Sequence, residues 1–209
     1  MILDGVVDAE NYYSGADIDF LSRLYALFFL AHWDNGLRDT DAEATRFYQA
    51  CVDAGPFQCR MYEGTSLGVE TRIKHIVDRL SILPIQFYDP TTGAYGILSG
   101  TDIKVALFKT LFRPYANGRA FYSALAALED NDMLPMARMS GKNLRDVSTC
   151  ECPAPSSVLL KGDEGTVAIA CGECAEVHDG LPELKEHYKR TANYSSFFSP
   201  LMNRRTDCA

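Results

Sequence analysis

The stretch TDAEATRFYQACVDAGPFQC, residues 40–59, sets the organisation of this chain. Its first half places apolar side chains at spacings of three and four, and this period predicts an amphipathic helix. The apolar positions are Ala44, Phe47, Cys51 and Ala54. Gly55 and Pro56 follow the last of them and predict the end of the helix.

Two cysteines fall in this stretch. Cys51 lies on the predicted apolar face, and Cys59 follows just after the turn. If the turn folds back, the two thiols can close a disulfide. Two buried free thiols are an equal alternative, because cysteine behaves as a small hydrophobic residue. The spacing alone leaves both interpretations open.

Outward from this stretch, apolar periodicity predicts a mainly α fold with a few short strands. Helices are predicted over residues 66–83, 102–111, 119–128 and 182–189, with Thr101 or Asp102 capping the second and Pro182 in the first turn of the last. The side chains predicted to face inward are Val69, Ile73, Ile76, Leu80 and Leu83 in the first of these helices and Phe121, Leu125 and Leu128 in the third. Short extended segments are predicted over residues 1–8, 85–88 and 166–170. Residues 134–157 show no periodicity and are interpreted as a loop.

The segment FYQACVDAGPFQC, residues 47–59, is similar to the F…C..AGP..C segment of the tripeptidyl-aminopeptidase-like α/β-hydrolases, a family of serine peptidases and related hydrolases. Three further segments agree with that family in order and spacing. They are ILDGVVDAENYYSG at 2–15, the YG.L…D…AL…L..P pattern within 84–114, and VAIACGE at 167–173 paired with Cys208. The chain therefore resembles the lid-bearing middle portion of the family.

This resemblance implies a partial α/β-hydrolase fold, with one core strand and its turn at residues 1–15. It also implies a helical lid-like region at 34–209 that ends with the return toward the core. An apolar segment at 16–33 interrupts the resemblance and is interpreted as an insertion or a retained intron. The resembled family further implies disulfides between Cys51 and Cys59 and between Cys171 and Cys208, if the chain matures in an oxidising compartment.

In the resembled family the nucleophilic serine precedes the first strand, and the acid and histidine follow the cysteine matched by Cys208. No catalytic residue is therefore carried over to this sequence. We expect a truncated, inactive relative of a serine hydrolase. A small peptide or ester would be its substrate only if the missing core were supplied.

Charge and hydropathy exclude several other classes. The formal net charge of −8 is spread along the 209 residues, whereas a nucleic-acid partner would require a basic stripe. The most apolar run, LYALFFLA at 24–31, is shorter than the roughly 20 residues that span a bilayer, so no transmembrane segment is predicted. The opening residues do not form a signal peptide, which predicts a cytoplasmic protein as encoded, although the resembled family is often secreted.

One motif offers a self-contained catalytic alternative. The segment GTSLG at 64–68 matches the G-x-S-x-G nucleophile elbow, with Ser66 as the nucleophile. An acid and a histidine follow in a suitable chain order, namely Asp132 or Asp163 with His178 or His187. The residues before Ser66 lack the composition of a buried strand, and an N-cap role at the start of the helix accounts for this serine more simply.

A third class is a non-enzymatic module. Cys150, Cys152, Cys171 and Cys174 could hold zinc tetrahedrally, although C-x-C is an unusual half-site. The apolar helix predicted at 20–31 could bind a partner. The sequence contains no phosphate-binding loop or dinucleotide motif, so no cofactor is predicted. Apolar surface left uncovered by a missing core would favour self-association.

Overall fold

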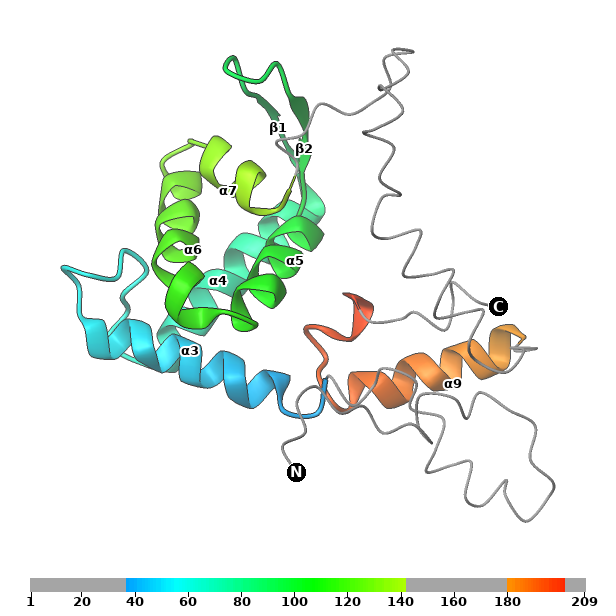
Figure 1. The fold of residues 1–209 in the computed structure, drawn as a ribbon. Coiled ribbons are helices and arrows are strands. Elements are labelled where there is room, and N and C mark those ends of the chain that lie inside the picture. Colours follow the sequence, from blue (N-terminus) through cyan, green and yellow to red (C-terminus); the bar gives the residue numbers. More distant parts are fainter. Residues whose placement is uncertain (1–36, 142–179, 202–209) are drawn as a thin grey trace, which may run out of the picture. The chain divides into compact units, whose positions relative to one another are not determined.

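The computed structural model describes residues 37–141 and 180–201. The chain divides into two compact units, one of residues 41–151 and the other of residues 1–40 and 152–209. Within the described ranges the structure is mainly helical, as the sequence predicted, and it contains six α-helices and one small antiparallel hairpin (Figure 1). The strands expected at 1–8 and 166–170 and the insertion at 16–33 lie outside the described residues.

Helix α3 spans Thr40–Ala54, as its apolar period predicted. Ala44, Phe47 and Cys51 are buried on one face, but Ala54 is exposed, which corrects the predicted stripe. The helix ends at this position, and Gly55 turns the chain away with a φ of +77° that favours glycine. Tyr48 is buried beside Phe47, so the buried face is wider than predicted.

Helices α4, Ser66–Ile82, and α5, Gly100–Leu111, pack against each other. The apolar side chains of α4 are buried as predicted as far as Leu80, whereas Leu83 is exposed because it follows the last residue of the helix. The N-cap of α5 is Ser99, whereas the sequence predicted Thr101 or Asp102. The Asp102 carboxylate accepts hydrogen bonds from the Ser99 backbone N–H at 2.7 Å and from its hydroxyl at 2.6 Å.

A hairpin of β1, Ile85–Tyr88, and β2, Tyr95–Leu98, lies between α4 and α5 in the sequence. Cross-strand partners share a face of the ladder, and Phe87 and Leu98 are buried on one face of it. Asp89 closes the turn and is only 1% exposed. Its Oδ2 accepts hydrogen bonds from Arg138 Nε and Nη2 at 3.0 and 2.8 Å, and this pairing lowers the pKa of the carboxyl group.

Helix α6 spans Pro114–Glu129 and packs against α5 and against α7, Leu134–Met139. Pro114 begins α6, whereas the sequence predicted a start five residues later. The predicted loop at 134–157 is wrong over α7, because a helix of 6 residues is too short to show apolar periodicity. Met136 and Ala137 of α7 are buried against the rest of this unit.

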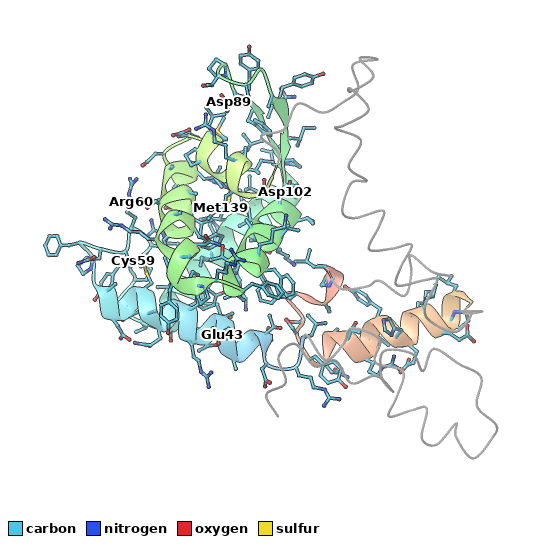
Figure 2. The ribbon with its side chains drawn as sticks, viewed as in Figure 1. Glu43, Cys59, Arg60, Asp89, Asp102 and Met139 are labelled. Atoms are coloured by element: carbon cyan, nitrogen blue, oxygen red, sulfur yellow. A yellow bond between two sulfur atoms is a disulfide. The ribbon has the colours of Figure 1, made fainter. Side chains whose placement is uncertain are left out.

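The core of this unit contains fully buried side chains from α4, α5 and α6. The largest include Ile73, Ile76, Leu80, Ile103, Leu107, Phe121, Leu125 and Leu128. Three predicted core residues of α6 are therefore confirmed. Figure 2 shows side chains filling the space between the helices of this unit, with Asp89 by the hairpin turn, Asp102 at the start of α5 and Met139 on α7.

The other unit contributes helix α9, Leu181–Ala192, and the 3-10 turn Ser199–Leu201. Pro182 lies in the first turn of α9, as predicted. His187 is buried on this helix, and its Nδ1 lies 2.8 Å from Arg190 Nη2. None of the helices within the described ranges is long and apolar enough to cross a membrane.

Candidate functional site

Ser66 is the first residue of α4, and the structure assigns its predicted capping role to the residue before it. Thr65 is the N-cap, and its hydroxyl oxygen accepts a hydrogen bond from the Gly68 N–H at 3.0 Å. Residues 55–65 form turns and irregular backbone. A nucleophile elbow requires a strand immediately before the serine, so the G-x-S-x-G match lacks its structural context.

Of the candidate partners of Ser66, only Asp132 lies within residues 41–141. Asp132 lies at the start of α7, where its Oδ1 accepts a hydrogen bond from the Leu134 N–H at 3.2 Å. His75 is the only histidine of this range, and it lies nine positions along α4. That separation is about 13.5 Å at 1.5 Å per residue, well beyond hydrogen-bond reach.

The remaining candidate partners of Ser66 lie outside the unit that contains this serine. His187 belongs to the other unit, and Asp163 and His178 lie outside the described ranges. The four cysteines of the zinc hypothesis, Cys150, Cys152, Cys171 and Cys174, also lie outside these ranges, as does Cys208. Among residues 37–141 and 180–201, no cluster of three or more potential metal-binding side chains occurs.

Cys51 and Cys59 form a disulfide, with a Cα–Cα distance of 5.3 Å. The chain reverses between them because Gly55 adopts its left-handed conformation and its carbonyl oxygen accepts a hydrogen bond from the Cys59 N–H at 2.9 Å. Both cysteines are buried. The disulfide thereby fastens the loop of residues 55–59 to the C-terminal half of α3.

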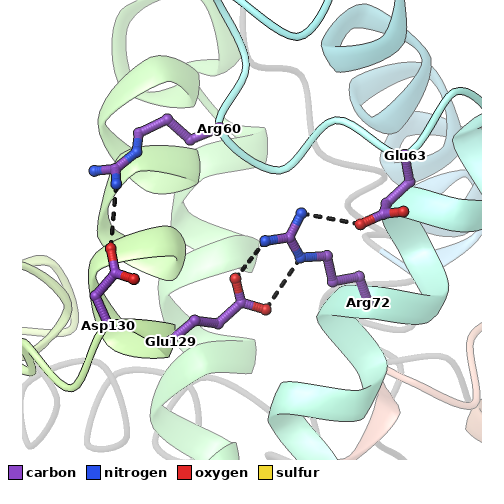
Figure 3. Close-up of polar contacts among 5 residues, drawn as sticks. All are labelled: Arg60, Glu63, Arg72, Glu129 and Asp130. Atoms are coloured by element: carbon purple, nitrogen blue, oxygen red, sulfur yellow. Dashed lines mark hydrogen bonds and ion pairs between the residues drawn. The ribbon is translucent and has the colours of Figure 1, made fainter.

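An ion-pair cluster holds the adjoining segment in place (Figure 3). Arg72 of α4 donates to both carboxylate oxygens of Glu129 in α6, from Nε at 3.0 Å and from Nη2 at 2.5 Å. Its Nη1 also donates to Glu63 Oε1 at 3.0 Å. The hydrogen bonds to Glu129 raise the pKa of Arg72. Arg60 pairs separately with Asp130 at 3.2 Å, so the segment after the disulfide loop is joined to α4 through Glu63 and to the end of α6 through Arg60.

A cavity of about 390 Å³ lies between α3, the disulfide loop and the N-terminal half of α6. Its lining residues are Glu43, Arg46, Phe47, Ala50, Cys51, Ala54, Gln58, Cys59, Pro114, Tyr115, Gly118, Arg119 and Tyr122. The apolar spacing in the sequence marks Phe47 and the cysteine spacing marks Cys51 and Cys59, but neither pattern predicts a cavity. The remaining wall comes from α6, more than fifty residues further along the chain.

The floor of this cavity is aromatic and apolar. The rings of Phe47 and Tyr122 stack with centroids 4.7 Å apart and an interplanar angle of 12°. The Tyr122 hydroxyl donates to the Phe47 carbonyl oxygen at 2.8 Å, so its polar atom is already engaged. Burial raises the pKa of Tyr122, and the phenol is therefore protonated and cannot serve as a base at neutral pH.

Gly118 determines how closely α3 and α6 approach at this point. A Cβ atom placed on it would lie 2.8 Å from Phe47 Cε2, closer than ordinary contacts allow. The missing side chain leaves room for the Phe47 ring against the α6 backbone. A small residue at this position is therefore required for the observed floor. Gly118 directly precedes the helix predicted at 119–128, so no sequence signal marked it.

The rim of the cavity is polar and positively charged. Arg46 and Arg119 both line it, and both are exposed to solvent. Glu43 is the acidic residue of the lining, and its Oε2 lies 3.8 Å from Arg46 Nη1. Figure 2 shows Glu43 and Cys59 toward opposite ends of α3, which places the charged rim and the disulfide along the same helix.

Compared with known proteins, the chain matches no family model, no curated protein and no solved structure.

Proposed function

We propose that this chain is a relative of the tripeptidyl-aminopeptidase-like hydrolases in which the helical unit covers a substrate pocket without supplying catalytic groups. The proposal is supported above all by the place of the segment at 47–59, which carries the resemblance. That segment forms both the disulfide loop and one wall of the 390 Å³ cavity. A lid is expected to contribute such walls, and the chemistry would come from a hydrolase core.

The surroundings of Ser66 within residues 41–141 support the proposal that this chain supplies no catalytic serine. A serine nucleophile needs a base within hydrogen-bond reach and donors aimed at the developing oxyanion. Within residues 41–141 the only histidine lies more than two helical turns away on α4, and no strand precedes Ser66. The described strands form one small hairpin, which is not the parallel sheet on which α/β-hydrolases place their catalytic residues.

We expect the purified chain to show no labelling by a fluorophosphonate probe and no turnover of aminoacyl chromogenic substrates or short esters. The measurement compares the chain with its Ser66→Ala variant, and an active serine hydrolase serves as a positive control. Labelling that disappears in Ser66→Ala would contradict the proposal and support a hydrolase that uses Ser66.

Self-association is a second proposal, favoured by apolar side chains that remain exposed. Ile82 and Leu83 at the end of α4 are 86% and 72% exposed. Tyr88 and Tyr95 face each other across the hairpin and are 62% and 66% exposed. Because paired residues point to the same side of the ladder, the two rings lie on the face opposite the buried Phe87. A second copy could cover this surface.

We expect the chain to sediment as a dimer or larger species in the micromolar range. Replacing Tyr88 and Tyr95 with threonine should shift it toward the monomer, because threonine keeps the strand preference and removes the apolar rings. Phe57→Ser is the matched control, since Phe57 is fully exposed and belongs to the disulfide loop rather than to the hairpin. A monomeric parent chain would contradict this proposal.

A further inference from the structure

We propose that the cavity between α3 and α6 binds a small aromatic carboxylate, with the ring on the apolar floor and the carboxylate at the arginine rim. This inference extends the lid proposal by naming the class of ligand. Its test measures binding by the chain itself. The outcome is therefore distinguishable from that of the hydrolase test, which measures covalent labelling.

The size and lining of the cavity favour a compact aromatic group. A volume of about 390 Å³ lies at the small end of the range of about 300–1,000 Å³ found for ligand pockets. The floor offers the stacked rings of Phe47 and Tyr122 and the buried disulfide. The Tyr122 hydroxyl is engaged by the Phe47 carbonyl, so the floor attracts an apolar ring and offers no new polar contact.

The positive charge of the cavity rim favours a negatively charged ligand. Arg46 and Arg119 outnumber the single carboxylate of Glu43, so the mouth is positive in a chain whose formal net charge is −8. Arg119 has no acidic partner among the residues that the structure describes. A guanidinium group can bind a carboxylate through two parallel hydrogen bonds. An anion therefore fits this rim, and an ammonium group would be repelled.

The experiment compares 2-naphthoate with its neutral analogue 2-naphthamide, using ligand-observed NMR and titration calorimetry on the full chain. We expect the carboxylate to bind about tenfold more tightly than the amide, because only the carboxylate is charged. A hydrogen bond to a charged group accounts for a difference in affinity of this size. The preference should weaken as salt is raised. Equal affinity for the two ligands, or no binding of either, would overturn the proposal.

Three variants locate the site. Arg119→Gln should remove most of the preference for the carboxylate, so that the two ligands bind with similar affinity. Arg79→Gln is the matched control, because Arg79 is an exposed arginine on α4 that does not line the cavity. Ala50→Phe should abolish binding of both ligands, since this exposed wall residue would fill the cavity. Unchanged binding by Ala50→Phe, or equal losses in the two arginine variants, would place the ligand elsewhere and contradict the proposal.

Discussion

Replacing Cys51 and Cys59 with alanine should lower the free energy of unfolding of the 41–151 unit by about 2.5 kcal/mol. The two cysteines are separated by 8 positions, and the loss of loop-closure restraint on a loop of this length accounts for that magnitude. For a unit of this size the change corresponds to a decrease of roughly 10 °C in the melting temperature. Alanine avoids placing new hydroxyl groups at two buried positions.

Reductant provides the matched control for this experiment. Reducing the parent chain should destabilise it by a similar amount, whereas the double variant should be insensitive to reductant in the same unit. Hydrogen exchange at the Cys59 amide, which donates to the Gly55 carbonyl oxygen at 2.9 Å, should accelerate in the variant. A variant as stable as the oxidised parent chain would show that the bridge contributes nothing to the fold.

Gly100→Ala should destabilise the same unit by about 2 kcal/mol, although helix propensity predicts the opposite sign. Alanine is favoured over glycine by up to about 1 kcal/mol inside a helix, and Gly100 is the first residue of α5. A Cβ atom at this position, however, would lie within 3.0 Å of the Val77 carbonyl oxygen and of the Ser81 hydroxyl oxygen in α4. Overpacking of this kind costs about 1–3 kcal/mol, and a backbone oxygen cannot rotate away.

Chemical denaturation of Gly100→Ala and Thr101→Ala decides between the two effects. Thr101 is the exposed neighbour on the same turn, so its replacement should change stability by less than about 0.5 kcal/mol. Combining Gly100→Ala with Ser81→Ala should recover part of the loss and leave the part due to the Val77 carbonyl. A stabilised Gly100→Ala variant would mean that α4 and α5 do not approach as closely as the structure shows.

Local signals in the sequence were sufficient to predict α3, α4 and the buried face of α6. A helix places every third or fourth side chain on one face, so a run such as Val69, Ile73, Ile76 and Leu80 defines its own buried side. The first and last residues of the helices were less predictable from the sequence. A helix cap depends on only one or two hydrogen bonds, so periodicity does not locate it. The N-cap of α4 was predicted at Ser66 and is Thr65, and that of α5 was predicted at Thr101 or Asp102 and is Ser99.

The sequence by itself therefore determined the helical class and most of the buried stripes, because these depend on residues only three or four positions apart. Only the tertiary structure decided that Cys51 and Cys59 are bridged, that Arg72 meets Glu129, and that α6 completes a cavity with α3. The cysteine spacing allowed either a disulfide or two buried thiols. The other two features join residues more than fifty positions apart, and their contact depends on how whole helices pack, which no local spacing records.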